Sequence, residues 1–261
     1  MINLVKKDLK LFFSNRQGMM LTFVLPIIFI TLFAFVFGKM NNSEENHLMS
    51  LVHSVAGTSV FMLLFSVAGI GGSLLDEKQE GMLKKLLCSP IPPDYIIFGK
   101  LLFANIISVI QLIIMFVYAW LVFGLDIMHH LPSLILMIFT IAFACSGFGL
   151  VLASFAKTRQ QVQGFSSIIV LVMSAIGGSM IPLFVMPEIM QKIAVFTVNY
   201  WGIQGIYDIF WKLVPLTDIT FLSRVFVLLC IGTFLNFIAL LMFRRNILNI
   251  DFLNFIKSKI S

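Results

Sequence analysis

Six long apolar stretches constrain this chain more than any other feature of its sequence. We expect them near residues 18–37, 54–75, 98–124, 133–155, 164–182 and 222–242. Each is about 20 residues or longer, the length that a helix needs to cross a hydrocarbon core about 30 Å thick. A backbone in lipid must satisfy its hydrogen bonds internally, so continuous runs of this kind favour helices over strands. The sequence therefore predicts an all-α, polytopic membrane protein with six transmembrane helices, in which residues 1–261 form a single domain.

Composition and charge agree with a membrane protein and orient it. Hydrophobic residues make up 59% of the chain and charged residues only 11%, which excludes an ordinary soluble domain. Most of the 18 basic residues share one side if the N-terminus is cytosolic. Positive residues near span ends favour the cytosol, so both termini of this multi-pass membrane protein are expected there. The net charge of +6 then reflects topology and contact with membrane lipids, and no nucleic-acid partner is expected.

The N-terminal segment, residues 1–17, has the pattern of an interfacial helix. At 100° per residue, about one third of its helical wheel collects the apolar residues Ile2, Val5, Leu9, Phe12 and Phe13. Lysines occupy the neighbouring arc. This arrangement suits a helix that lies in the cytosolic headgroup layer before the chain enters the first span. A basic leader that only sets the topology is the alternative.

Residues 76–93 form the polar segment that separates the second and third spans, and they predict a short cytosolic helix. Asp76, Glu77 and Glu80 would lie in its first turn, where the helix dipole favours acidic residues. Leu83 and Leu86 would lie on an apolar face, and prolines end the helix. Such a face could seat in a groove of a soluble partner, with Leu83 and Leu86 as its buried anchor. The alternative is a helix that rests on lipid headgroups without a partner.

Two motifs resemble those of a known family. The first is the run Glu77–Leu87, read as Glu-Lys-Gln-Glu-Gly-Met-Leu-Lys-Lys-Leu-Leu, followed by Ser89-Pro90 and Phe98-Gly99-Lys100. It resembles the second cytosolic segment of type-2 ABC exporter permeases, such as daunorubicin-resistance and polysaccharide-export permeases. Met82 and Lys84 depart from that family's usual Thr and Glu. The second motif, Gly177–Pro182 followed by Met186-Pro187-Glu188, resembles the family's glycine-rich exit into short outer helices.

The resemblance implies a permease subunit that exports an amphiphilic drug, peptide or lipid-linked molecule from a bacterial cytosol. Its partners would be ABC-type ATPase subunits and a second permease, either another copy or a related chain. Residues implied to couple the chain to the ATPase are Glu77, Glu80, Gly81, Leu83, Leu86, Leu87 and Pro90. Residues implied for the outer exit region are Gly177, Gly178, Pro182 and Pro187.

The sequence also lacks a nucleotide-binding loop of its own. Gly38-Lys39 is followed by Met40, and Gly99-Lys100 by Leu101, so no phosphate-cradling Gly-x-x-x-x-Gly-Lys-Ser/Thr run exists. We therefore expect no enzymatic activity and no cofactor on this chain, with ATP and Mg²⁺ bound by the partner ATPase.

Polar residues within the expected spans are candidates for a substrate path. They are Asn105, Ser108, Gln111, Ser166, Ser167, Ser174 and Asn236. Hydrogen bonding between helices is the alternative for each of them. In the fourth span, a stripe of small residues spaced by four, three and four positions predicts a close approach of a neighbouring helix. The stripe consists of Ala142, Ser146, Gly149 and Ala153. Residues 183–221 are expected to form short re-entrant helices at the outer surface.

Two other functions remain open from the sequence. An ion-coupled secondary transporter usually buries acidic residues or histidines at membrane depth, because the coupling ion needs a site there. Here the acidic residues fall in expected loops or near membrane boundaries, which disfavours that mechanism. A non-transporting membrane scaffold or regulatory subunit is the other alternative, and copurification of an ATPase would distinguish it from a permease.

Overall fold

The computed structural model describes residues 2–39, 44–88, 93–243 and 245, and within them the regular secondary structure is helical. Pro90, one of the expected coupling residues, lies outside these ranges. The elements are α1 (Ile2–Ser14), α2 (Arg16–Met19), η1 (Met20–Val24), α3 (Leu25–Lys39), α4 (Glu44–Gln79), α5 (Met82–Leu87), α6 (Pro93–Phe123), η2 (Met128–His130), α7 (Leu131–Phe155), α8 (Arg159–Ile176), η3 (Leu183–Val185), α9 (Glu188–Ala194), α10 (Val198–Phe210) and α11 (Ile219–Phe243). The all-α prediction is confirmed.

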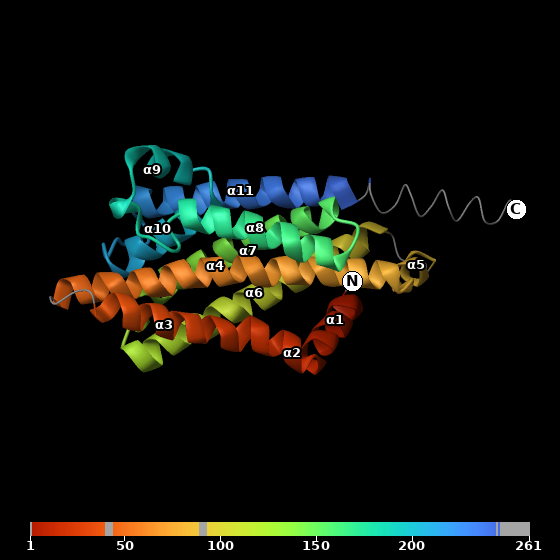
Figure 1. Cartoon of the computed structure of the whole chain (residues 1–261), viewed down its shortest axis with the longest axis horizontal. Helices are drawn as coiled ribbons and strands as arrows, with labels where there is room; N and C mark the ends of the chain where they lie inside the picture. Colours follow the sequence, from red (N-terminus) through yellow and green to blue (C-terminus); the bar gives the residue numbers. More distant parts are fainter. Residues whose placement is uncertain (1, 40–43, 89–92, 244, 246–261) are drawn as a thin grey trace, which may run out of the picture.

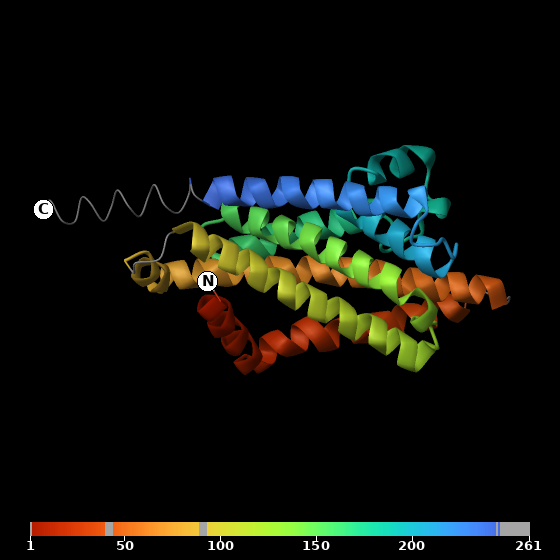
Figure 2. The same cartoon turned by 180° about the vertical axis from the view of Figure 1, so that it is seen from behind.

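The long helices form one bundle with two distinct ends. In Figure 1 and, from behind, in Figure 2, α3, α4, α6, α7, α8 and α11 extend along the long axis of the molecule. The short helix α5 and the start of the chain lie at one end, here called the α5 end. The short helices α9 and α10 lie at the opposite end, here called the α9 end.

Five described helical segments are long and apolar enough to cross a membrane. They are Arg16–Val36, Leu48–Gln79, Tyr95–Phe123, Met128–Phe155 and Ile219–Phe243. These segments coincide with five of the six expected spans, which makes the chain a polytopic membrane protein. The remaining expected span, near 164–182, corresponds to α8, which begins earlier and carries the polar run Arg159–Gln161 in its first turn. With 18 residues, α8 is about 27 Å long and lies at the lower limit for crossing.

The helix α4 forms the centre of the bundle. In its apolar window 78% of the residues are buried, compared with 22% in the first span and 28% in α11. The main apolar cluster joins α4 to α6, α7, α10 and α11. The first span and α11 instead expose large apolar side chains such as Phe35 and Phe226. Such exposure is normal where lipid replaces water, so these two helices form the periphery.

Glycines set the distance between α4 and its neighbours. A Cβ on Gly71 of α4 would lie 2.7 Å from the Gly149 backbone oxygen and 2.9 Å from the Ala153 Cβ, both on α7. A Cβ on Gly149 would lie 2.7 Å from the Val67 backbone. These contacts leave no room for a side chain, so α4 and α7 pack backbone against backbone. The stripe of small residues predicted in the fourth span is confirmed as a helix-packing face.

The first span begins with a sharp change of direction. Figure 1 shows α1 lying across the direction of the long helices and meeting α2 at an angle. Asn15 separates α1 from α2 and caps the N-terminus of α2. Its side-chain oxygen accepts a hydrogen bond from the Gly18 amide, at 3.1 Å. The π-helical turn η1 follows and ends at Val24, two residues before Pro26. Proline lacks an amide donor for the carbonyl four residues earlier, which favours such a local widening.

Candidate functional site

The α4–α5 corner, residues 76–88, is a turn between two helices at the α5 end. The helix break falls at Glu80 and Gly81, and Gly81 takes a φ of +73°. This left-handed conformation favours glycine because a Cβ would be strained there. Asp76 and Glu77 therefore lie in the last turns of α4, and not in the first turn of the short helix as expected. The expected short helix itself is present as α5.

Leu83 is turned toward the bundle of its own chain. Its side chain is 1% exposed, which corrects the expectation that Leu83 is an anchor available to a partner. Leu86 is partly buried against the same apolar cluster, and the side chain of Leu87 lies outside the described structure. The buried members of this cluster are Leu74, Leu83, Ile96, Ile97, Leu150, Ala239 and Phe243. The apolar face of α5 packs inward because α4, α6, α7 and α11 already present an apolar surface there.

A buried group of charges joins three helices beside the corner. Lys100 of α6 lies between Asp8 of α1 and Glu77 of α4, with its Nζ 2.7 Å from Asp8 Oδ2 and 2.8 Å from Glu77 Oε1. All three residues are buried. Lys7 is more exposed and approaches the same carboxylates at 3.4 Å and 3.7 Å. Two positive and two negative charges therefore compensate one another where water is largely excluded.

Apolar contacts bring α1 against α6 at the same level. A Cβ on Gly99 would lie 2.8 Å from Leu4 Cδ2, so the absence of a side chain lets α1 approach. Further along the two helices, the rings of Phe12 on α1 and Phe103 on α6 meet edge to face with centroids 6.1 Å apart. Gly99 and Lys100, the dipeptide noted in the sequence, thus form one contact surface for α1.

The face that α1 turns toward the bundle includes only part of the expected apolar face. Val5 and Asp8 are buried, whereas Ile2 and Phe13, expected on the apolar face, are 66% and 45% exposed. Asp8 falls on the inward face because it lies three residues after Val5 on a helix. Hydrophobic periodicity did not indicate the ion pair of Asp8 at the centre of this contact. The predicted position of α1 in the headgroup layer stays a prediction.

The corner is also tied to the start of α8. Arg159 of α8 forms an ion pair with Asp76, one residue before Glu77. Gln79 donates a side-chain hydrogen bond to the Lys157 carbonyl in the α7–α8 connection, at 3.5 Å. Consecutive residues at the end of α4 therefore contact α8 in one direction and α1 and α6 in the other.

At the α9 end, Asn199 connects the glycine-rich turn to α10. Its Nδ2 donates to Ser174 Oγ of α8 at 2.8 Å and to Ser179 Oγ at 2.7 Å. A Cβ on Gly177 would lie 2.7 Å from the Asn199 Cβ, and Gly178 takes a φ of +88°. The expected exit residues Gly177 and Gly178 therefore allow this tight turn. Pro182 and Pro187 precede η3 and α9.

A buried acidic residue lies on the adjoining helix. Asp208 of α10 is 1% exposed and pairs with Lys212 at 2.6 Å and with Arg224 of α11 at 3.4 Å. Arg224 lies over the Trp201 ring, 5.3 Å from its centroid. Because α10 is largely buried against α4, α7 and α11, the segment 183–221 is more integrated into the bundle than its amphipathic sequence suggested.

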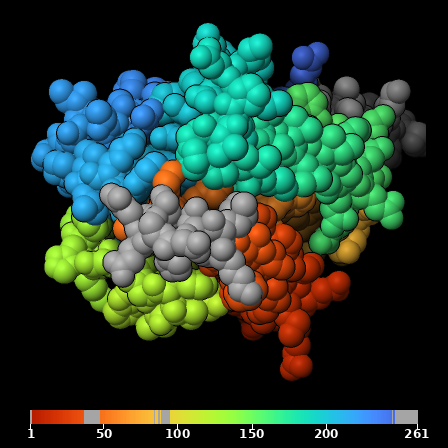
Figure 3. Space-filling model, turned by 60° about the vertical axis from the view of Figure 1, so that its left-hand side comes forward, coloured from red at the N-terminus to blue at the C-terminus, as the bar shows by residue number. Residues whose placement is uncertain are grey.

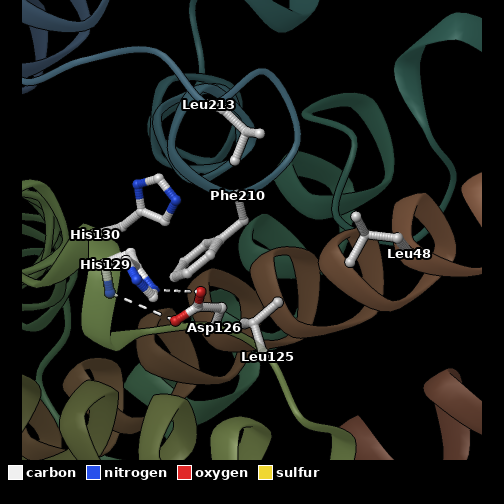
Figure 4. A pocket seen from close by; sticks show the side chains of 7 residues that line it. All are labelled: Leu48, Leu125, Asp126, His129, His130, Phe210 and Leu213. Carbon is white, nitrogen blue, oxygen red and sulfur yellow. Dashed lines mark hydrogen bonds and ion pairs between the residues drawn. The ribbon is translucent and has the colours of Figure 1, made fainter.

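A shallow hollow of about 350 Å³ opens at the same end. Figure 3 shows that end of the molecule, and Figure 4 shows the hollow between the α6–α7 connection, the start of the α4 span and the end of α10. Asp126 and His129 interact across 2.6 Å within it. The lining residues are Leu48, Leu125, Asp126, His129, His130, Phe210 and Leu213. In the described part of the chain, no three His, Cys, Asp or Glu side chains are grouped to hold a metal ion.

The seven polar residues proposed for a substrate path do not meet in one place. Ser108 and Ser167 donate to carbonyls of their own helices, while Ser174 and Asn236 form hydrogen bonds between elements. Asn105 is half-buried. Gln111 and Ser166 are buried and have no hydrogen-bond partner among the described residues. None of the seven lines the hollow of Figure 4.

The sequence did not single out Asp8 or Asp208. An acidic residue within a basic amphipathic helix was the available signal for Asp8, because such a residue needs a partner when it faces inward. Asp208 stands among apolar residues of α10 with no motif that marks it. Asn199-Tyr200 partly resembles an Asn-Pro position of the same exporter family, but that resemblance did not indicate the contacts of Asn199 with Ser174 and Ser179. Their partners come from other helices and become visible only in the folded chain.

Comparison with known proteins identifies relatives of most of this chain. The sequence model of the family described as ABC-2 type transporter matches residues 1–211. The linearmycin resistance permease protein LnrN of Bacillus subtilis is 25% identical over 164 residues, which are 63% of this chain and 42% of LnrN. The putative transport permease YvfS of the same species is 21% identical over 210 residues, 77% of this chain and 82% of YvfS. The match to LnrN thus spans less than half of that protein.

Proposed function

Because the chain belongs to the ABC-2 type transporter family, whose members are multi-pass membrane permeases, we propose that it is the permease of an ATP-driven exporter. ATP would be hydrolysed by a separate ATPase subunit, which binds the nucleotide and Mg²⁺. This chain would bind neither. The proposed exporter contains a second permease, either another copy or a related chain.

The α4–α5 corner is the observation that supports this function best. It is a polar turn beyond the apolar part of the longest helix, and its exposed residues include Gln79, Glu80 and Lys85. A soluble ATPase would bind this exposed surface. The inward residues Glu77 and Leu83 would transmit its movement, because they connect the corner to the membrane-spanning helices. In this proposal, the exposed residues of the corner bind the ATPase, and its buried residues transmit the ATPase's movement to the membrane-spanning helices.

In this proposal α8 completes six crossings. Its start pairs with Asp76 at the α5 end, and Ser174 near its last turn reaches Asn199 at the α9 end. The α5 end would face the cytosol, as the distribution of basic residues favours. Both termini would then be cytosolic, in the plasma membrane of a bacterium. The short helices η3, α9 and α10 would lie at the outer surface, where the glycine-rich turn leads out of α8.

The proposed cargo is an amphiphilic compound, such as a drug, a peptide or a lipid-linked molecule. One relative is named as a linearmycin resistance permease, so linearmycin is the first compound to test. The substrate path is proposed to include Gln111 and Ser166, because each is a buried polar side chain without a protein partner in the described structure.

Transport by inverted membrane vesicles tests this function directly. We expect vesicles that contain the chain and its ATPase to accumulate linearmycin when ATP and Mg²⁺ are supplied. An ATPase variant that binds but does not hydrolyse ATP should abolish the uptake, and a protonophore should leave it intact. Uptake that a protonophore abolishes would contradict the proposal in favour of an ion-coupled carrier. Failure of the chain to copurify with any ABC ATPase would favour a non-transporting membrane subunit.

A further inference from the structure

The hollow at the α9 end has a polar side and an apolar side. Asp126, His129 and His130 of the α6–α7 connection form the polar side, and the two histidines lie opposite Leu48 in Figure 4. Leucines and Phe210 form the apolar side. We propose that this hollow is a binding site for a small amphiphile that carries an ammonium group and an apolar chain. The inference goes beyond the proposed function, because the hollow contains none of the residues proposed for the substrate path and needs no ATPase to bind a ligand.

The polar side of the hollow favours a cation. The Asp126 carboxylate is ionised at neutral pH, and its side chain is 60% exposed. His129 donates from Nδ1 to Asp126 Oδ2 at 2.6 Å, because an ionised carboxylate can only accept. In the neutral ring the other nitrogen is then an acceptor as well. None of the seven described lining residues is a lysine or an arginine, so the carboxylate and the imidazole acceptor suit an ammonium group.

The apolar side combines a fixed floor with exposed leucines. Phe210 is 4% exposed, and its ring stacks on Phe116 of α6 with centroids 6.1 Å apart. Leu48 and Leu213 are 45% and 62% exposed. Because these leucines share the hollow with the exposed Asp126, they face water or headgroups and not the hydrocarbon of the membrane. An apolar chain laid on them would remove their surface from water, which favours binding.

Leu213 occupies a position at which glycine is the usual residue. Its φ is +52°, in the left-handed region where a Cβ is strained. The Lys212 amide holds this turn by donating to the Tyr207 carbonyl at 2.9 Å. The Val214 amide donates to the Asp208 carbonyl at 2.8 Å. The exposed side chain of Leu213 adds little to the packing of the bundle, so its strained position indicates a role in binding.

The size of the hollow limits the ligand. Its volume of about 350 Å³ lies near the lower end of the roughly 300–1,000 Å³ that is usual for ligand pockets. A short alkyl chain with one ammonium group fits within it. Hexylammonium is therefore a suitable probe, and hexanol and hexanoate are its neutral and anionic counterparts.

Protection of an engineered thiol tests the site. Leu48→Cys places a thiol on the apolar side, and Lys192→Cys places one on α9 outside the hollow. Both are made in a Cys88→Ser, Cys230→Ser background, which removes the exposed native thiols. The full chain in phosphatidylcholine nanodiscs is modified by a neutral, water-soluble methanethiosulfonate reagent, with or without each probe at equal concentration. We expect hexylammonium to slow modification of Leu48→Cys severalfold and to leave Lys192→Cys unchanged.

Each other outcome contradicts a stated part of the proposal. Absence of protection by hexylammonium would overturn the site as a whole. Slower modification of both thiols would do the same, because the effect would not be local. Equal protection by hexanol or hexanoate would overturn the preference for a cation. These results do not depend on transport, so failure of the vesicle experiment would contradict the proposed function and leave this site standing.

Substitutions in the hollow separate binding from folding. Asp126→Asn should abolish protection by hexylammonium and keep the unfolding temperature, because it removes the charge of an exposed side chain at constant size. Glu188→Gln removes an exposed acidic residue of α9 outside the hollow, so protection should persist. Undiminished protection in Asp126→Asn would overturn the proposal.

Leu213→Gly tests the apolar side. Glycine adopts a φ of +52° more readily than leucine, so the variant should keep its unfolding temperature while protection by hexylammonium weakens. Full protection in Leu213→Gly would overturn the role of this side chain in binding. Loss of the fold would overturn it as well, since the bundle itself would then require the leucine.

Discussion

Gly99 and Lys100 show how two adjacent residues acquire distinct roles from their neighbours. Gly99 admits Leu4 of α1 because it has no side chain, and Lys100 neutralises Asp8 and Glu77. Neither role requires a nucleotide, although the same pair of residues ends many phosphate-binding loops. At the residue scale, the surrounding chain decides what a short motif does.

Leu83 provides a test at the residue scale. Leu83→Asp should destabilise the permease itself, because a charge would be placed in the apolar cluster beneath α5. We expect a loss of at least the 2–5 kcal/mol that is typical of truncating a buried leucine to alanine. Thermal unfolding in detergent measures the effect.

Lys85→Asp is the matched control, since Lys85 is exposed on the same short helix. It should leave the unfolding temperature unchanged and weaken binding of the ATPase. Equal stability of Leu83→Asp and the unsubstituted protein would contradict the inward packing of Leu83.

At the scale of elements, α4 has the central position because its surface suits close neighbours. Gly71 packs against α7, and Gly57 lies so close to the Ser179 carbonyl that a Cβ could not fit. Small residues let helices approach in lipid, where hydrophobic burial gives no net attraction between them. The same helix ends in two acidic residues that contact α1, α6 and α8. One continuous helix therefore links the packed centre to the corner.

Two glycines on α4 allow a controlled test of this packing. Gly71→Ala should lower the unfolding temperature, because the added methyl group would meet the Gly149 carbonyl and the Ala153 Cβ. Overpacking of this kind costs about 1–3 kcal/mol. Gly69→Ala, two residues earlier, has open space around the new Cβ and should be neutral or stabilising by up to about 1 kcal/mol. The same result for both variants would contradict the close contact between α4 and α7.

At the scale of the whole molecule, the two ends of the bundle carry different structural features. The α5 end carries the buried ion pairs and the corner, while the α9 end carries the turn at Gly177, the buried Asp208 and the hollow of Figure 4. Desolvation of the exposed Asp126 in that hollow raises its pKa, but the hydrogen bonds and positive charge of His129 outweigh this, so the pKa stays below its ordinary value. The two ends are joined by α8 as well as by the five more apolar helices.

Thiol labelling in intact cells decides on which side each end lies. A membrane-impermeant reagent should label Lys192→Cys on α9 and fail to label the native Cys88 at the α5 end, in a Cys230→Ser background. The physical reason is that α8 would carry the chain across the membrane between these positions. Labelling of neither position in intact cells, but of both after permeabilisation, would show that α8 does not cross. Labelling of Cys88 alone would reverse the orientation.

The sequence by itself determined the membrane class, the helical architecture and the positions of five spans. Long apolar runs leave a backbone in lipid no alternative to internal hydrogen bonding, so these features follow from local composition. The stripe of small residues around Gly149 could also be recognised as a helix-packing face from the sequence, because small residues at helical spacing mark one face of one helix. The glycine-rich turn before Pro182 was recognised as well, whereas the break at Gly81 was not, because a single short helix was expected to run through that position.

Only the tertiary structure decided which residues face one another. Leu83 and Leu86 have the same apolar character in the sequence, and nothing local indicated that Leu83 would be buried in one cluster with Ile96 and Phe243 while Leu86 is only partly buried there. Asp8 and Lys100 lie on α1 and α6, with α2, α3, α4 and α5 between them in the chain, so their ion pair exists only once α1 lies on α6. A long-range contact depends on the relative placement of whole helices, and the periodicity of a single helix contains no information about it. The surface that could meet a partner was therefore misassigned, although the segment that carries it was correctly recognised.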